Sequence, residues 1–266
     1  MRWTEVGKVT ELRTYPVKGF AGISHNALAI DAMGPVGDRR YMLVDDAGKF
    51  VTQRALPQLA TLQAKVSANR LTLVTDNQQT LPVDFGSSPQ PARVWQDDVS
   101  VVEAIPAVND WLSERLGCAV RLVKLADGAK RIRHGSARPE PFAVSFADGY
   151  PFLLTSESSL TALNRNLSQP VALERFRANI VVSGAPEFAE ENWQQVKVGD
   201  VVFPATKKCQ RCQVITIDQN FGTPSSKEPL QVIPQITPQG ELTFGINLIH
   251  ETVGHLQLGD TVWAVA

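Results

Sequence analysis

Over the first hundred residues, hydrophobic and polar positions alternate in short runs that are separated by turn-forming residues. RYMLV and KFVTQ flank residues 45–48, and LATLQAKV and RLTLVTD flank residues 67–69. A third run, ARVWQDDVSVVEA, carries Asp97 and Asp98 at its expected bend. Alternation with a period of two between tight turns is typical of antiparallel hairpins. The pattern therefore predicts an antiparallel barrel or sandwich up to about Ala104.

Helical spacing is found in two places. In residues 107–116 the hydrophobic residues fall on one face, and Gly117 follows where a helix commonly ends. A second helix is expected to begin at Thr155 or Ser156, whose hydroxyls can cap its first turn. From Asn179 the pattern returns to strands, which include the similar runs VGDVVF and LGDTVW. The predicted fold class is thus mainly β with a few helices (α+β).

Two segments do not follow this pattern. Residues 127–142 are rich in glycine, proline and cations and lack any periodicity, so they predict a loop or an interdomain connection. A loop of this length would also suit a mobile cover over a site. Cys118 precedes the apolar run VRLVKL, and it is expected to be a buried packing residue.

Composition narrows the class of protein. The 266 residues carry a formal net charge of -1, whereas proteins that bind nucleic acid or membrane surfaces usually have a basic excess. The start of the chain lacks the apolar core of a signal peptide, and no stretch is long and apolar enough for a membrane span. The odd number of three cysteines, without a secretion signal, indicates a reducing compartment. We therefore expect a cytoplasmic protein that binds neither nucleic acid nor a membrane.

Two of the cysteines, Cys209 and Cys212, form the sequence CQRC, and their spacing allows several functions. A structural zinc site requires four ligands, usually from two such pairs, and the chain has no second pair. The segment HETVGH has one residue too many for a zinc-protease motif, so on a helix His250 and His255 would lie about 140° apart. A thioredoxin-type dithiol would be placed at the start of a helix, whereas CQRC is followed by QVITID, whose alternation predicts a strand.

The remaining functional interpretation is a single thiolate that binds a soft, anionic metal cofactor. Lys207, Lys208 and Arg211 would favour the thiolate and would attract a phosphate-bearing ligand. A solvated basic turn with an inert cysteine pair explains the same residues. The local sequence alone leaves both interpretations open.

The longer run CQRCQVITIDQNFGTPSSKEPLQVI resembles the signature of the MOSC family, the molybdenum-cofactor sulfurase C-terminal domains. FADGYPFLLTSESSLTALN, RFRANIVVSG, VGDVVF, FGINL and GDTVW occur in the family's order. YPVKG and MGPVGDRRYMLVDDAGKFVTQR resemble the β-barrel module that precedes MOSC in one branch, which includes the mitochondrial amidoxime-reducing component. The resemblance covers nearly the entire chain. It implies an N-terminal MOSC-associated β module at residues 1–104 and a β-barrel MOSC domain at residues 105–266.

The resemblance also implies a molybdenum cofactor, a molybdopterin, held by a cysteine thiolate. The metal ligand would be the second cysteine of the motif, Cys212, which would also be the catalytic residue, while Cys209 would be supporting or incidental. Lys18 and Arg40 would meet the phosphate or the pterin. Gly19 stands where relatives tend to have a hydroxyl residue, so a contact there must be lost or made by backbone N–H. The other implied cofactor-binding residues are Thr155, Ser156, Arg177, Asn179, Gln210 and Arg211.

By this resemblance, the expected activity is the reduction of N-hydroxylated or N-oxide substrates by removal of oxygen at the cysteine-bound molybdenum. Electrons would come from a separate reductase or ferredoxin-like protein, because the sequence has no CxxxxCxxC pattern for an iron–sulfur cluster. Lys207, Lys208 and Arg211 would screen the negative charge of the site. Asp218 is a candidate general acid, although a turn-capping role is favoured.

Two other classes of function stay open. A carrier protein would hold a persulfide on the same cysteine, or the molybdenum cofactor itself, and would pass it to other enzymes. An interaction module with an inert CQRC would bind no cofactor. Metal content and sulfur that cyanide releases distinguish the three classes.

Overall fold

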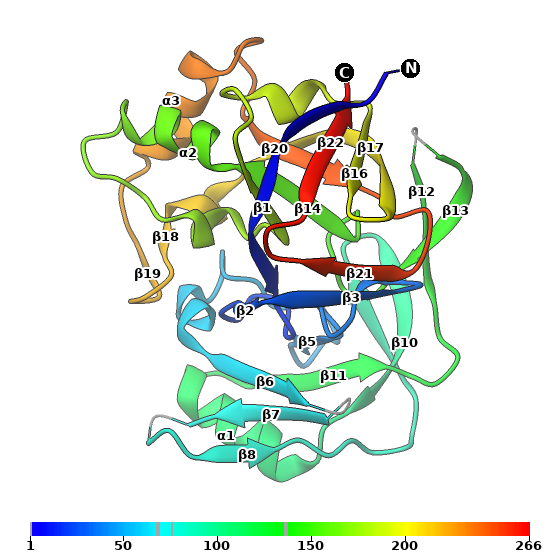
Figure 1. Ribbon diagram of the computed structural model, residues 1–266. Coiled ribbons are helices and arrows are strands. Elements are labelled where there is room, and N and C mark those ends of the chain that lie inside the picture. The colour runs from blue at the N-terminus through cyan, green and yellow to red at the C-terminus, as the bar shows by residue number, and fades with distance from the viewer. Residues whose placement is uncertain (1, 68–69, 76, 136–137) are drawn as a thin grey trace.

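Strand β1 (Thr4–Thr14) pairs with both β22 and β15 and so closes the main sheet into a seven-stranded barrel (Figure 1). The computed structural model describes residues 2–67, 70–75, 77–135 and 138–266. Around the barrel the strand order is β15-β14-β20-β17-β16-β22-β1, and β2 extends the sheet beyond β1. The bounds are β2 (Ile23–His25), β14 (Phe152–Ser156), β15 (Ile180–Ser183), β16 (Gln195–Val198), β17 (Val201–Gln210), β20 (Thr243–Leu248) and β22 (Thr261–Val265).

The barrel interior is filled by apolar side chains that alternate along its strands. Val196 and Val198 of β16 and Phe203 of β17 are fully buried in one cluster with Phe152 of β14. The rings of Phe152 and Phe203 meet edge to face, with their centroids 5.1 Å apart. Burial of each such side chain stabilises the fold by roughly 1.5–3 kcal/mol, and a closed barrel leaves no free strand edge.

Three smaller sheets lie below the barrel in the view of Figure 1. A four-stranded sheet has the order β5-β11-β10-β9, and β6, β7 and β8 form a three-stranded meander. Between these and the barrel lies the sheet β21-β3-β4. The domain boundary expected at residue 104 stays a prediction. The bounds are β3 (Ala27–Asp31), β4 (Gly34–Pro35), β5 (Tyr41–Val44), β6 (Gln63–Ser67), β7 (Arg70–Val74), β8 (Thr80–Pro82), β9 (Gln90–Val94), β10 (Asp97–Glu103), β11 (Arg121–Leu125) and β21 (Gly254–Gln257).

Helices cover the outside of these sheets. α1 packs its buried face on the four- and three-stranded sheets, while α2 and α3 pack against each other beside the barrel. In the part of the chain that the structure describes, no helix combines the length and the apolar character needed to cross a membrane. The helices are α1 (Pro106–Leu116), α2 (Glu157–Asn164) and α3 (Glu228–Ile236), with the 3-10 helices η1 (Pro57–Thr61), η2 (Leu173–Phe176), η3 (Ala189–Asn192) and η4 (Gln213–Thr216).

The predicted fold class, mainly β with a few helices, is confirmed. The hairpin turn at residues 45–48 is closed by a 2.9 Å hydrogen bond from the Gly48 N–H to the Asp45 carbonyl. β6 and β7 pair antiparallel as expected, and residues 68 and 69 of their predicted turn lie outside the described residues. The third bend comes earlier than predicted, because Asp97 already pairs with Val94. α1 and α2 form where the helical spacing predicts them.

Two local predictions are wrong. Cys118 is exposed, because the chain leaves α1 at the surface through the left-handed Gly117 and burial resumes only at Val120. Residues 127–142 do not form a plain loop, since they contain most of a β-hairpin, β12 (Arg131–Gly135) with β13 (Arg138–Val144). The hairpin buries Phe142 and Val144 against Ile249.

The strand predicted for QVITID is also replaced by other structure. Residues Gln213–Thr216 form η4, and the strand β18 (Ile217–Asp218) that follows pairs with β19 (Thr223–Pro224). The Thr216 hydroxyl donates to the Gln213 carbonyl at 2.8 Å, a local bond that favours a turn over an extended strand. A thioredoxin-type dithiol nevertheless requires an α-helix after the cysteine pair, and η4 is a single four-residue 3-10 helix.

A buried acidic pair, Glu190 and Glu191 in η3, gives the fold a pH dependence. Burial raises the pKa of Glu191 to about 7, although the Thr243 hydroxyl and the nearby Lys208 ammonium lower it again in part. Glu191 is 5 % exposed, and its Oε1 atom has no hydrogen-bond partner. In the folded protein this carboxyl therefore keeps its proton over a pH range in which the unfolded chain has already lost it.

We expect the free energy of unfolding to fall as the pH rises from about 4.5 to about 7, because over this range the folded state holds the extra proton. Glu191→Gln mimics the protonated form. It should stabilise the protein at pH 8 by on the order of 2 kcal/mol, and much less at pH 5. Urea unfolding of both proteins at the two pH values measures this difference. An equal effect at both would contradict the assignment.

Candidate functional site

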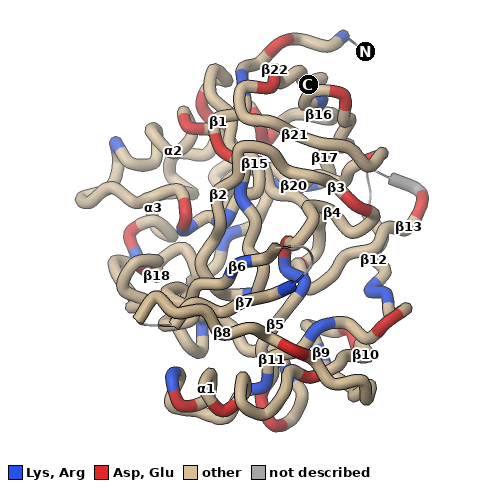
Figure 2. Tube along the Cα trace, turned by 60° about the horizontal axis from the view of Figure 1, so that its bottom comes forward, with Lys and Arg blue, Asp and Glu red and all other residues tan. Residues whose placement is uncertain are grey.

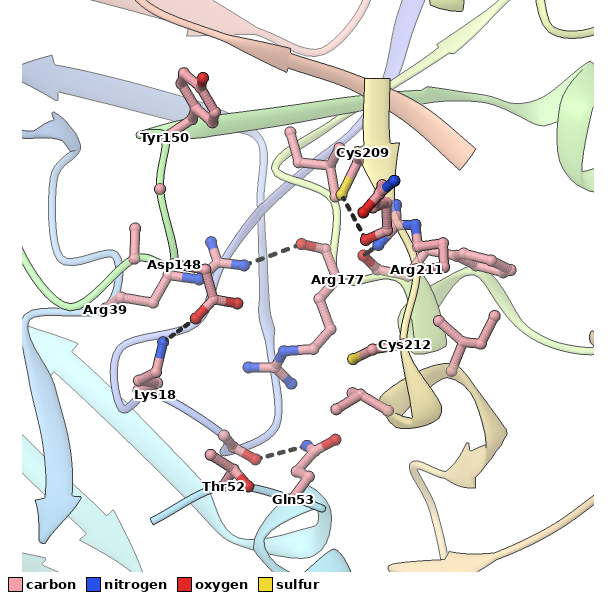
Figure 3. A pocket seen from close by; sticks show the side chains of 18 of the residues that line it. Lys18, Arg39, Thr52, Gln53, Asp148, Tyr150, Arg177, Cys209, Arg211 and Cys212 are labelled. Carbon is pink, nitrogen blue, oxygen red and sulfur yellow. Dashed lines mark hydrogen bonds and ion pairs between the residues drawn. The ribbon is translucent and has the colours of Figure 1, made fainter. Parts of the chain in front are cut away.

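A cavity opens where the barrel meets the N-terminal sheets, and Figure 3 shows its side chains. Its wall is assembled from distant parts of the chain: the segment after β1, residues 50–54, the β9–β10 turn, residues 147–150, the segment that precedes β15, and the end of β17 with the residues after it. Seven of the ten predicted cofactor-binding residues line this cavity. They are Lys18, Gly19, Arg177, Asn179, Gln210, Arg211 and Cys212.

The other three predicted residues lie elsewhere. Arg40 extends away from the cavity, where its Nη2 donates to Asp31 at 2.7 Å and to the Pro35 carbonyl at 3.1 Å. Thr155 and Ser156 are fully buried at the junction of β14 and α2. The Ser156 Oγ accepts a hydrogen bond from the Ser159 N–H of α2, so the first turn of this helix is satisfied by its own cap.

Arg39, the neighbour of Arg40, lines the cavity instead. Its backbone is in the left-handed region at φ 45°, and its guanidinium donates to Asp38 at 2.6 Å and to the Arg177 carbonyl at 3.1 Å. Burial alone would lower the pKa of Arg39, but the Asp38 carboxylate outweighs it and raises the pKa. Arg39 also lies 3.3 Å from the Asn179 Oδ1 atom and so joins two walls of the cavity.

Arg177 contributes a cation with unused hydrogen-bonding capacity. Its guanidinium stacks 4.2 Å from the centre of the buried Tyr15 ring, and its Nη1 donates to the Phe20 carbonyl at 2.8 Å. The Nη2 atom is buried without a hydrogen-bond partner. Burial lowers the pKa of Arg177 to about 10, which still leaves the side chain charged at neutral pH.

Lys18, Asp148 and Trp95 form a polar wall on the opposite side. The Lys18 ammonium forms an ion pair with Asp148 (Figure 3) and donates to the Phe146 carbonyl at 2.8 Å. The Trp95 indole N–H donates to Asp148 at 2.8 Å. Desolvation would raise the pKa of Asp148, but its contacts with Lys18 and Trp95 hold the pKa well below its usual range. Asp148 is therefore an anion whose oxygens still reach the solvent of the cavity.

The cavity has a strong excess of positive charge. In Figure 2 basic and acidic positions are interspersed along the chain, so this excess is local. Asp148 is the one carboxylate among the described residues that line the cavity, against six cationic side chains. Such a concave site attracts anions. The six cations are Lys18, Arg39, Arg54, Arg175, Arg177 and Arg211.

The two cysteines of CQRC differ in their surroundings. β17 is bulged against β20 between Lys208 and Gln210, and the strand ends there, so Cys212 follows in an irregular segment. Cys212 is exposed and its sulfur points into the cavity (Figure 3). Cys209 packs against a buried apolar cluster, and burial raises the pKa of its thiol.

The cations next to the cysteines are held by other groups. Lys208 pairs with Glu241 at 2.8 Å, and the Lys207 ammonium lies 5.8 Å from the centre of the Tyr150 ring. Neither lysine lines the cavity. The expectation that both screen the negative charge of the site therefore gains no support from direct contact. Arg211 does line it, although its guanidinium donates to the Phe176 and Phe244 carbonyls.

Two known domain families match this chain. The model of the MOSC N-terminal beta barrel domain matches residues 6–119, and that of the MOSC domain matches residues 141–263. Mitochondrial amidoxime reducing component 2 of Rattus norvegicus is 30% identical over 97% of this chain and 83% of its own length. The chain belongs to the MOSC family.

Two further relatives of this MOSC protein have different names. Mitochondrial amidoxime-reducing component 1 of Homo sapiens is 29% identical over 97% of the chain and 83% of its own length. Molybdenum cofactor sulfurase of Danio rerio is 30% identical over 92% of the chain but only 32% of its own length.

Sequence reasoning missed Arg39, Trp95 and Asp148 in the cavity of the MOSC protein. Asp148 belongs to the segment FADGYPFLL, so the motif itself was a usable signal for it. No feature of the sequence marks Trp95 as a site residue, because only the tertiary fold brings the β9–β10 turn to Asp148. Asp218 is placed as the turn-capping interpretation predicts: its Oδ1 accepts from the Asn220 and Phe221 N–H groups at 2.9 and 3.1 Å.

Proposed function

We propose that the cavity binds a molybdenum–pterin cofactor and that the protein reduces N-hydroxylated small molecules with electrons from a separate donor protein. The observation that carries this proposal is the Cys212 thiol, exposed on the wall of a cationic cavity that Arg177, whose buried Nη2 has no partner, also lines. A thiolate is the protein ligand that soft metals prefer. The names of the relatives with amidoxime-reducing activity support the same class of substrate.

The residues present fit the chemical groups of this cofactor. Its phosphate requires cations and N–H donors, which Arg177 and Lys18 supply, and a buried donor without a partner is costly until a ligand accepts from it. Arg39 takes the place that was expected for Arg40. Gly19, whose φ of 92° favours glycine, faces the cavity with its backbone. Asn179 and Gln210 add amide groups that can recognise the pterin edge.

When bound, the molybdenum centre supplies the two-electron chemistry that removes oxygen from an N–O bond, so that two electrons and two protons give the amine or amidine and water. Cys212 would hold the metal at the cavity wall. Lys18 holds a proton on Nζ inside the cavity; burial lowers its pKa, although Asp148 partly offsets this, so the ammonium releases a proton more readily than a surface lysine does. Arg177 and Arg39 would orient the anionic part of the cofactor.

The test is metal and cofactor analysis of protein made in a host that synthesises molybdopterin. We expect about one molybdenum per chain and reduction of an aromatic amidoxime to the amidine with a chemical reductant as electron source. Iron and labile sulfide should be absent, because the proposal places the electron donor on another protein. Protein without molybdenum under these conditions would refute the proposal.

A carrier of sulfur or of the cofactor is the second candidate. Its support is the same exposed Cys212 together with the similarity to a protein named molybdenum cofactor sulfurase. A carrier would yield sulfur on treatment with cyanide, without stoichiometric molybdenum and without amidoxime reduction. An inert interaction module would show none of these properties, and its folding and behaviour would not change in Cys212→Ser.

A further inference from the structure

Residues 145–150, named the cavity segment from here on, form the wall that carries Asp148 and Tyr150. The last four of these residues line the cavity, and the carbonyl of Phe146 accepts a hydrogen bond from Lys18 at 2.8 Å. The segment contains no helix or strand, only bends. The Phe146 N–H donates to the Arg39 carbonyl at 2.9 Å, and side-chain contacts from elsewhere hold the rest of the segment.

Arg131, the first residue of β12, supplies these contacts. Its side chain is only 1% exposed, which is rare for an arginine unless its donors are used. Nη1 donates to the Ala147 carbonyl and lies 3.3 Å from that of Ser145, and Nη2 donates to the Asp148 carbonyl at 3.2 Å. One guanidinium thus contacts three backbone carbonyls of the cavity segment.

The fourth contact of Arg131 links the segment to the β9–β10 hairpin. Its Nε donates to the Asp97 Oδ2 at 2.6 Å, and Asp97 opens β10 directly after the turn that carries Trp95. The Trp95 indole reaches back and donates to Asp148 at 2.8 Å. The cavity segment and the β9–β10 hairpin are therefore joined twice, by the Arg131–Asp97 ion pair and by an indole–carboxylate hydrogen bond.

The rest of the hairpin β12–β13 supports the same segment from behind. Phe142 stacks on Tyr150 with the ring centroids 5.9 Å apart, and Val144 packs with Ala147 in one buried cluster. The hairpin is thus a fixed support for the cavity wall, with apolar and charged contacts that a mobile cover would lack.

We propose that Arg131 is the positioning residue of this site: through the three carbonyls and Asp97 it holds Asp148 against Lys18 and Trp95. Arg131 itself does not line the cavity. The effect of Arg131 on the reduction of N-hydroxylated compounds rests on the proposed function. The effect of Arg131 on the position of Asp148 does not.

The chain contains a matched control. Arg133 pairs with the same carboxylate, with its Nη1 2.9 Å from the Asp97 Oδ2, but it is 35% exposed and makes no hydrogen bond to the cavity segment. Arg131→Met and Arg133→Met each remove one cation from Asp97. Only Arg131→Met removes the donors to the cavity segment.

The readout is the indole N–H signal of Trp95 in ¹H–¹⁵N spectra of the full chain, assigned among the five tryptophans with Trp95→Phe. In Arg131→Met we expect this signal to move toward its position in Asp148→Ala and its proton to exchange with water about tenfold faster or more, the factor that corresponds to loss of a hydrogen bond to a charged group. In Arg133→Met the signal should stay in place and the exchange rate should change less than about twofold.

A second variant covers the case in which Arg131→Met does not fold. Arg131→Lys keeps the charge opposite Asp97 but cannot serve three carbonyls at once, so it should shift the Trp95 signal in the same direction by less. An unmoved Trp95 signal in a folded Arg131 variant would overturn the inference, even if its melting temperature falls. In the loaded enzyme, kcat/KM for an amidoxime should fall about tenfold in Arg131→Met and not in Arg133→Met. A wild-type protein without this activity would refute the proposed function and leave the spectroscopic result standing.

Discussion

Replacing Cys212 by alanine is expected to leave the protein folded and to remove its molybdenum and its reductase activity together. Cys212 is exposed on the cavity wall, so its side chain contributes little to packing, and truncation should change the free energy of unfolding by less than about 0.5 kcal/mol. Loss of groups that only support metal ligands already costs about 10- to 100-fold in metal affinity or activity, so loss of the ligand itself should cost about 100-fold or more. Molybdenum per chain and the rate of amidoxime reduction measure the effect.

Cys209→Ala is the matched control for this prediction. Cys209 lies three residues away, but it packs against the buried cluster with Leu153 and Val181, and burial raises the pKa of its thiol. A thiol that resists ionisation is a poor metal ligand. The variant should keep most of its molybdenum and activity and lose on the order of 1 kcal/mol of stability. If instead Cys209→Ala loses the metal and Cys212→Ala keeps it, the ligand has been assigned to the wrong sulfur.

The sequence placed Cys212 near Lys18 and Arg177 correctly, but it did not predict the structure of the segments around these residues. The ordered motifs brought Lys18, Arg177 and Cys212 to one cavity although 194 residues separate the first from the last in the chain (212 − 18). Arg40 was the predicted contact, but Arg39 lines the cavity, because neighbouring side chains point in different directions and the left-handed backbone of Arg39 is set by the tertiary fold. A motif identifies the segment that reaches a site, but backbone geometry decides which side chain enters it.

The hairpin β12–β13 was not predicted, and the reason is different. Period-two alternation marks a strand with one buried and one solvated face, whereas this hairpin buries a charged side chain, Arg131, along with apolar ones such as Phe142. A buried arginine is stable only because Asp97 and three backbone carbonyls receive its donors, and those partners lie elsewhere in the chain. Hydropathy therefore classified as a loop a segment that supports the cavity wall.

Arg177→Met is expected to have two opposite effects, because the Nη2 of Arg177 is buried without a hydrogen-bond partner. In the protein loaded with cofactor, we expect retention of molybdenum through gel filtration to weaken about 10- to 100-fold, because a charge-assisted hydrogen bond to the ligand is lost. In protein made without cofactor, the variant should be as stable as the wild type or more stable, because it replaces a buried cation that has an unsatisfied N–H.

Inorganic phosphate separates this effect from general damage to the site. It should raise the melting temperature of cofactor-free wild-type protein by mass action, and much less that of Arg177→Met. Arg175→Met is the control, since Arg175 also lines the cavity but already donates to Ser225 at 2.6 Å and to Asp218 at 3.2 Å. Both of its terminal nitrogens already have acceptors, so its loss should leave phosphate binding and molybdenum retention close to wild type. Equal losses in the two variants would mean that the cavity responds to positive charge in general, and the free N–H of Arg177 would then have no special part in holding the anion.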